Sequence, residues 1–355
     1  MRARKQSTWK RFRKNPTAMA GAAVLLLFFI IALSGYGITP DQTRNADLQA
    51  VEIQGMPPGF RQNFLRIETN TAPQPWYWPV TGKRPTYQLI PVKIYRITTD
   101  SVIFRQYVDT DTFALKSIIK EPGKKIDALR KTFWLGTDGF GRDMLSRLMI
   151  GTRASMAVGF ISVFISLLIG IILGALAGYY RGRTDAVVMW FINITWSIPT
   201  LLLVFALTLA LGKGFWQIFV AVGLTMWVNV ARLVRGQVMA ARELEYVQAS
   251  RVLGFSDFRI LFRHILPNIT GPIAVVAASN FATAIIIEAG LSFLGLGVQP
   301  PVPSWGLMIK ENYNFIITQS PMLALLPGLA IMLMVLAVNL VGNGIRDAMD
   351  VRSLN

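Results

Sequence analysis

Six apolar segments constrain the fold of this chain more than any other feature of its sequence. Each is close to the ~20 residues that an α-helix needs to cross the hydrocarbon core of a bilayer. The segments cover Thr17–Ile38, Met156–Ala177, Val187–Leu211, Phe215–Ala231, Thr270–Gly290 and Met322–Gly342. Pro199 lies inside the third segment, where we expect it to kink the helix. The sequence therefore predicts an all-α polytopic membrane protein with six transmembrane helices.

The distribution of Lys and Arg predicts which side of the membrane each connection faces. Seven basic residues and no acid lie in residues 1–16, and six more basic residues lie in residues 232–268. The two short loops on the other side hold only Lys213 and Lys310. Because cytoplasmic loops carry the excess of Lys and Arg, both termini and residues 232–268 are expected in the cytoplasm. A cleaved signal peptide would share the charged start, but no clean small-residue cleavage site follows it.

Composition and missing motifs exclude several other classes of protein. The chain has no cysteine and a single histidine, His264, which leaves no disulfide, thiolate site or histidine cluster. It contains neither a GxxxxGK[ST] phosphate loop nor a nucleophile elbow, so we do not expect it to be an enzyme or to bind a cofactor. Its net charge of +17 suits membrane topology and anionic lipid, since no soluble basic domain remains to bind nucleic acid.

The long polar stretch between the first two apolar segments predicts a separate small domain. Residues 39–150 contain an aromatic cluster at 76–78, and apolar and polar residues partly alternate from Tyr87 to Val108. Such alternation indicates short β-strands. We expect a β-containing extracytoplasmic insertion, followed by an interfacial helix and too short to be a complete substrate-binding protein. Its basic residues do not oppose this placement, because long loops escape the positive-inside rule.

Glu245–Asn268, EYVQASRVLGFSDFRILFRHILPN, lies between two apolar segments but is too polar to cross a bilayer. Its first part has no proline or glycine up to Gly254, which predicts a helix that ends there. Ser256 and Asp257 are suited to cap a second helix, which Pro267 would end. The sequence thus predicts a helix–glycine–helix element at the membrane surface. A solvated amphipathic loop is the plainer alternative.

This stretch resembles the EAA loop of permease subunits in binding-protein-dependent ABC importers. The family pattern has a small-residue patch, then a glycine, then a Leu-Pro pair. The corresponding residues are Glu245, Gln248, Ala249, Ser250, Gly254, Leu266 and Pro267. Gln248 replaces the usual acid and Ser250 the second alanine of the family pattern. In that family the loop couples the permease to its ATPases, and the resemblance implies the same role here.

A second motif narrows the resemblance to the dipeptide, oligopeptide and nickel permeases. Residues 134–155 read WLGTDGFGRDMLSRLMIGTRAS, similar to the family phrase LGTDxxGRDxxSRxxxGxRxS. The N-terminal phrase WKRFRKNP at Trp9–Pro16 and the phrase PSWG at Pro303–Gly306 also resemble this group. The resemblance leaves out most of residues 39–130.

The region around this second motif is expected to form an interfacial helix with a structural role. We expect Arg142 and Arg147 to turn outward, and Asp138 or Thr137 to cap the helix. The opposite face would be apolar, with Leu145, Leu148 and Met149.

The resemblance implies a type I ABC importer permease, the second of a pair, in the bacterial inner membrane. Its partners would be a homologous permease, two ATPases that bind ATP and Mg²⁺, and an extracytoplasmic binding protein. Di- or oligopeptides are the expected substrates, with nickel or another small solute as the alternative. The domains would be residues 1–16 (N-terminus), 17–38 (helix 1), 39–150 (insertion), 151–343 (core, with coupling loop 232–268) and 344–355 (tail).

Glu288 is the one clear acid inside an apolar segment, so it is a candidate for the translocation path. A buried carboxyl bonded to a neighbouring helix or to loop backbone is the plainer interpretation. A secondary transporter would usually carry more such intramembrane charges. Asn339 and Asn343 could bond across helices, and Arg346, Asp347 and Asp350 resemble the family's terminal phrase, where a surface ion pair is expected.

Overall fold

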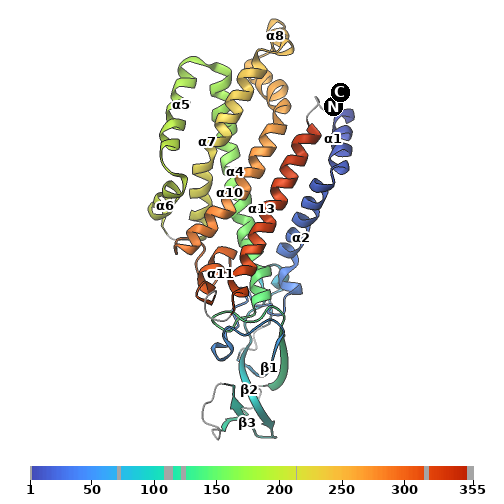
Figure 1. Ribbon diagram of the computed structural model, residues 1–355, viewed down its shortest axis with the longest axis vertical. Helices are drawn as coiled ribbons and strands as arrows, with labels where there is room; N and C mark the ends of the chain where they lie inside the picture. The colour runs from blue at the N-terminus through green and yellow to red at the C-terminus, as the bar shows by residue number, and fades with distance from the viewer. Residues whose placement is uncertain are drawn as a thin grey trace. The chain divides into compact units, whose positions relative to one another are not determined.

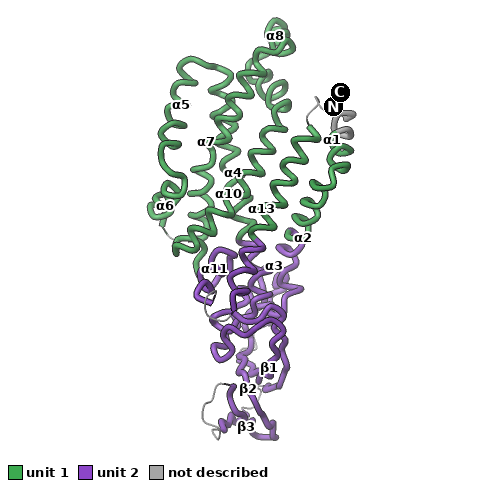
Figure 2. The backbone as a smooth tube through the Cα atoms, viewed as in Figure 1, with its two compact units in different colours: residues 1–28, 155–299, 331–355 green, residues 29–154, 300–330 purple. Residues whose placement is uncertain are grey.

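The computed structural model describes residues 2–69, 73–107, 115–120, 125–212, 214–315 and 320–349. The chain divides into two compact units, coloured separately in Figure 2. Unit 1 comprises residues 1–28, 155–299 and 331–355, and unit 2 comprises residues 29–154 and 300–330. Helices α2, α4 and α13 each contribute residues to both units.

Unit 1 is helical (Figure 1). Its elements are α1 (Arg2–Lys14), α2 (Pro16–Ile38), α4 (Met144–Tyr180), α5 (Gly182–Ser197), α6 (Thr200–Leu211), α7 (Phe215–Arg242), α8 (Glu245–Val252), α9 (Asp257–Arg259), η2 (Ile260–Ile265), η3 (Leu266–Asn268), α10 (Thr270–Phe293) and α13 (Met322–Met349). Within the described residues, five helices are long and apolar enough to cross a membrane, and α5 with α6 makes a sixth if the bent pair is one span. The bend between α5 and α6 is 94° and falls at Ile198–Pro199, so the kink expected from Pro199 is confirmed.

Small residues allow α4 and α7 to pack closely. A Cβ added at Gly170 would collide with Val230, and one added at Gly174 would collide with Ala231. Gly159 of α4 faces the ring of Phe281 on α10 in the same way. Small residues at a helix interface allow the two backbones to approach this closely. A buried amide adds polar contacts, because Asn280 of α10 donates to the Met226 carbonyl oxygen of α7 at 3.3 Å.

Three helices are longer or more regular than the apolar segments predicted. The basic N-terminus forms α1, and Asn15 caps α2 by accepting from the Ala18 amide at 3.1 Å, with Pro16 at the first helical position. The expected interfacial helix is the start of α4, which is continuous into the second span. Helix α7 continues past the predicted loop start at Arg232, because Val234, Val238 and Ala241 give it a buried face.

Unit 2 contains a five-stranded antiparallel sheet in the order β4-β3-β2-β1-β5. The strands are β1 (Phe60–Glu68), β2 (Tyr87–Ile97), β3 (Ser101–Gln106), β4 (Lys116–Ile119) and β5 (Ile126–Phe133). The unit also holds η1 (Val51–Ile53), α3 (Trp78–Thr81) and α11 (Trp305–Asn312). The strands predicted between Tyr87 and Val108 are confirmed as β2 and β3; Val108 itself lies outside the described residues. Buried side chains on the sheet, Phe64 and Phe133 among them, form its core.

Two glycines of the 134–155 motif, Gly136 and Gly141, lie in tight turns in unit 2. Gly136 and Gly141 have φ of +79° and +71°, and backbone oxygens of Met56 and Ala50 occupy the places that their Cβ atoms would take. Only glycine fits such positions without strain. The motif therefore fixes a backbone path against residues 50–56.

Arg142 and Arg147 of this motif are buried, so the expectation that they turn outward is wrong. Arg142 donates to Asp138 at 2.7 Å and to Glu311 of α11 at 2.7 Å, and Arg147 donates to Glu311 at 2.9 Å. Burial alone would lower the pKa of Arg142, but the carboxylates of Asp138 and Glu311 outweigh it and raise that pKa above its ordinary value. Asp143, rather than Asp138 or Thr137, caps α4, since it accepts from the Ser146 amide at 2.9 Å.

This ion network makes a prediction about stability. Replacing Arg142 by Met removes its bonds to Asp138 and Glu311, leaves Arg147 as their one remaining arginine partner, and should cost about 3 kcal/mol of unfolding free energy. Arg66→Met is the matched control, because Arg66 pairs with Asp127 at 2.8 Å on the surface and should cost at most about 1 kcal/mol. Denaturant unfolding of both purified variants measures the difference. Equal losses would show that the buried network does not hold unit 2 together.

Candidate coupling element and membrane cavity

The expected helix–glycine–helix element is present, and its glycine closes α8 with a specific hydrogen-bond pattern. The Gly254 amide donates to the Arg251 carbonyl at 2.9 Å, and the Phe255 amide donates to the Ser250 carbonyl at 3.1 Å. These two bonds form a Schellman motif with Gly254 at φ +77°. A Cβ at Gly254 would meet no atom within 4 Å, so glycine is required there by backbone conformation and not by space.

The second half of the element is helical but irregular. Ser256 caps α9 by accepting from the Arg259 amide at 3.4 Å, as expected from the sequence. The turn then widens into the π-helix η2 and ends in the 3₁₀ turn η3 at Leu266–Asn268. Pro267 has no amide hydrogen, so the helical ladder cannot continue through it. Helix α10 starts two residues after η3 ends, at Thr270.

The element presents apolar side chains on its surface. Val252, Leu253 and Phe258 are 89%, 71% and 70% exposed, which is unusual for a polar connection. Gln248 and Ala249 are exposed as well, whereas Ser250 is buried and donates to the Tyr246 carbonyl oxygen at 2.8 Å. An exposed apolar patch on a structured loop is typical of a protein-docking surface. Ala249 therefore belongs to that surface, and Ser250 belongs to the packing beneath it.

Tyr179, near the end of α4, is the anchor of this element. Its hydroxyl donates to the Asp257 carboxylate at 2.6 Å, and its carbonyl oxygen accepts from Arg242 at 2.5 Å. The guanidinium carbon of Arg251 lies 5.2 Å from the centre of the Tyr179 ring. The tyrosine is 3% exposed and packs in one cluster with Val247 and Ile260. Sequence reasoning missed Tyr179, because nothing in its local pattern separates it from the neighbouring Tyr180.

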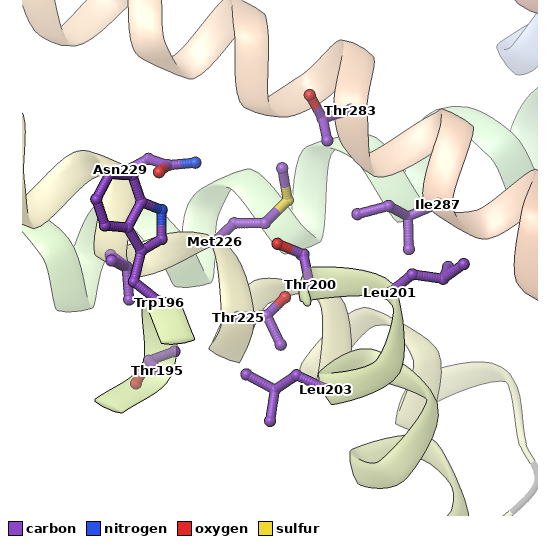
Figure 3. Close-up of a pocket in the computed structure, with 11 residues that line it drawn as sticks. Thr195, Trp196, Thr200, Leu201, Leu203, Thr225, Met226, Asn229, Thr283 and Ile287 are labelled. Carbon is purple, nitrogen blue, oxygen red and sulfur yellow. The ribbon is translucent and has the colours of Figure 1, made fainter. Parts of the chain in front are cut away.

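A cavity of about 280 Å³ lies within unit 1 where the α5–α6 bend meets α7 and α10. Figure 3 shows side chains from these four helices around it. The lining residues are Thr195, Trp196, Thr200, Leu201, Leu203, Thr225, Met226, Val228, Asn229, Thr283 and Ile287. None of these eleven is charged, and five carry a hydroxyl or amide. The bend at Pro199 thus creates a neutral, hydrogen-bonding recess.

Glu288, the sequence candidate for the translocation path, is not among the residues that line this cavity. It is fully buried, and its Oε1 accepts from the Ser292 hydroxyl at 2.7 Å. The Ser292 oxygen in turn accepts from the Val298 amide at 3.3 Å, which ties the end of α10 to the following loop. Glu288 is therefore bonded to Ser292 of its own helix, and it is the Ser292 oxygen that reaches the loop backbone.

The remaining polar candidates of the last helix lie near the surface. Asn339 and Asn343 are exposed, and Asp347 accepts from the Asn15 side chain at 3.5 Å. Asp350 lies outside the described residues. The described part of the chain contains no group of three or more His, Asp or Glu side chains that could hold a metal ion.

These features define a class, a polytopic membrane protein with a polar recess among its helices and an exposed apolar loop. A family model described as binding-protein-dependent transport system inner membrane component matches residues 170–354. A second model, the N-terminal TM domain of oligopeptide transport permease C, matches residues 5–58. The chain belongs to the family of binding-protein-dependent transport permeases.

Curated relatives and a solved structure agree with this assignment. The oligopeptide transport system permease protein OppC of Bacillus subtilis is 39% identical over 262 residues, 74% of this chain and 83% of that protein. The glutathione transport system permease protein GsiD of Pectobacterium atrosepticum is 44% identical over 217 residues, 61% of this chain and 72% of that protein. The inward-facing MetNI methionine ABC transporter shares the fold, with a TM-score of 0.50 at 20% identity over 58% of this chain and 98% of that one.

The Tyr179 anchor generates a prediction about coupling. Tyr179→Phe removes only the hydroxyl that donates to Asp257, so α8 and α9 should move less tightly with α4. In the assembled importer we expect transport per ATP hydrolysed to fall by about tenfold or more, because a hydrogen bond to a charged group contributes about 1.5–3 kcal/mol. Tyr180→Phe is the matched control, because Tyr180 is 52% exposed and should leave this ratio unchanged. An unchanged ratio in Tyr179→Phe would show that the hydroxyl bond does not transmit motion.

Proposed function

We propose that this chain is one of two permease subunits of an ABC importer that carries di- or oligopeptides across the bacterial inner membrane. Two ATPase subunits bind ATP and Mg²⁺, a separate binding protein delivers the peptide outside, and this chain holds no cofactor. The names of its relatives, which include peptide and glutathione permeases, support the substrate class. The cavity supports it too, because its lining has hydroxyl and amide groups but no His, Cys, Asp or Glu that would favour nickel.

The observation that carries the proposal is the exposed apolar surface of the Glu245–Asn268 element. Val252, Leu253 and Phe258 would lose water contact on docking to an ATPase subunit, which makes docking favourable. The Schellman turn at Gly254 and the Tyr179 anchor hold the element as one rigid piece. ATP-driven closure of the ATPases would then shift this lever and switch the spans between inward-open and outward-open states.

In this proposal both termini and the coupling element are cytoplasmic, and residues 39–150 lie outside. The support is the asymmetry of Lys and Arg between the connections. Glu245, Gln248, Ala249, Gly254, Leu266 and Pro267 form the coupling surface and its frame, with Ser250 packed beneath. Glu288 acts by fixing the outer end of α10 beside the path.

The first test of this proposal replaces two residues of the coupling element. Gly254→Val forces a β-branched residue to φ near +77°, and Ala249→Trp adds bulk to the docking surface. We expect both complexes to assemble, but transport to fall by at least about tenfold while ATP hydrolysis loses its response to the binding protein. Gly254→Asn and Ala249→Ser are the matched controls, since asparagine tolerates positive φ and serine stays small. Parental transport in both bulky variants would exclude this element as the coupling route.

The second test concerns topology. Because the chain has no cysteine, the single variants Ser256→Cys and Gln88→Cys each carry one thiol in this subunit. We expect a membrane-impermeant thiol reagent added to intact cells to label the thiol of Gln88→Cys and to spare that of Ser256→Cys, and the reverse in inside-out vesicles. Labelling of the Ser256→Cys variant from outside intact cells would overturn the orientation.

A further inference from the structure

Arg232 is a basic residue well inside α7 that rests on an aromatic ring. It lies about 15 Å before the end of the helix at Arg242, by the rise of an α-helix. In the part of the chain that the structure describes, no carboxylate lies within salt-bridge distance of it, whereas Arg235 pairs with Asp185 at 2.5 Å. Instead, its guanidinium carbon lies over the Trp196 ring, 3.4 Å from the ring centre. Among the described residues, the partner of this cation is therefore an aromatic ring and not a carboxylate.

Arg232 contacts a residue that lines the cavity, although it is not a lining residue itself. Trp196, which carries its guanidinium, is a lining residue from the last turn of α5. Thr225 and Asn229, also lining residues, precede Arg232 on α7 by seven and three positions, so all three share one helix face. This face extends from the recess shown in Figure 3 toward the coupling end of α7.

Three of the four threonine hydroxyls that line the cavity are arranged to accept hydrogen bonds. Thr195, Thr225 and Thr283 each donate to a carbonyl oxygen of their own helix, at 2.9, 2.8 and 2.9 Å. Their oxygens therefore keep lone pairs for a donor, such as an ammonium or peptide N–H group. Such a wall suits the donor groups of a peptide but leaves its carboxylate without a counter-charge. Arg232, resting on a lining residue, is placed to supply that charge.

We propose that Arg232 binds the C-terminal carboxylate of the transported peptide, and that Trp196 holds the guanidinium until the peptide arrives. This inference rests on the proposed peptide import. The planar fork of arginine pairs with a carboxylate in a bidentate, charge-assisted way that an aromatic face cannot match, so the ligand displaces the ring. A lipid phosphate offers similar chemistry to arginine, and the experiment below separates it from the peptide.

The test uses the absence of native cysteine in this chain. Arg232→Cys, assembled with cysteine-free partner subunits and binding protein, should import peptide at least about tenfold more slowly. Attaching a trimethylammonium group to the new thiol through a thiosulfonate reagent should restore most of the rate, because it returns a cation. A sulfonate attached in the same way should not. Equal rates after the two reagents, whether high or low, would overturn the proposal.

A comparison of peptide binding identifies the occupant. In nanodiscs, the parent complex should bind a small peptide with a free C-terminus at least about tenfold more tightly than its C-terminal amide, and added anionic lipid should not compete. Arg232→Cys should bind both peptides equally and weakly, because the guanidinium is gone. Gly236→Cys is the matched control: it lies one turn further along α7, where an added Cβ meets nothing within 4 Å, and it should keep the preference of the parent. Equal binding of the two peptides by the parent, or displacement of the peptide by anionic lipid, would contradict the assignment.

The parent complex separates this inference from the function on which it rests. A parent that imports no peptide would overturn both. A parent that imports peptide, with a position 232 that is indifferent to charge and to peptide, would overturn only the role of Arg232.

Discussion

The close contact between α4 and α7 is the constraint on which the rest of unit 1 depends. Glycines along α4, including Gly174 and Gly178, bring its backbone against α7, where no larger residue would fit. This contact places Tyr179, near the end of α4, beside Arg242, the last residue of α7. The same α7 carries Thr225 and Asn229 into the cavity. One helix pair therefore positions both the recess and the anchor of the coupling element.

Rigidity of the coupling element comes from two unlike sources. Gly254 supplies a backbone conformation that few residues tolerate, and its Schellman bonds close α8 without help from side chains. Tyr179 supplies a side-chain bond that ties α9 to a membrane helix. The exposed Val252 and Leu253 are apolar, and this character favours contact with another protein. In the proposed function, such an element would transmit motion that it receives at its surface.

Local backbone chemistry made part of this structure predictable from sequence. Gly254 tolerates a positive φ, and Pro199 has a fixed φ and no amide hydrogen. The end of α8 and the bend between α5 and α6 could therefore be predicted from the sequence. Alternating apolar and polar residues indicated β2 and β3, because successive side chains of a strand point to opposite faces of a sheet. Ser256 was recognisable as a cap because it precedes a helix that needs one.

Long-range partners made the rest unpredictable. Arg142 looked like an outward-facing charge because its partners Asp47 and Glu311 lie 95 and 169 positions away along the chain. Tyr179 and Asp257 are 78 positions apart, and no local pattern links them. The cavity also depends on packing, since α5, α6, α7 and α10 all contribute to it. The predicted end of α7 was wrong for a different reason. The charged Arg232 suggested the start of a loop, although the buried apolar face of α7 continues beyond it to Ala241.

Hydrogen exchange across the coupling element tests the central claim most directly. The exchange of amides in residues 245–268 should be measured in the permease pair alone and after assembly with its ATPase subunits. Docking should slow exchange through α8 and α9, while the strands β1–β3, which contact no ATPase in this account, should exchange as before. Unchanged exchange in residues 245–268, with new protection elsewhere on the chain, would contradict the claim that this element receives the motion of the ATPases.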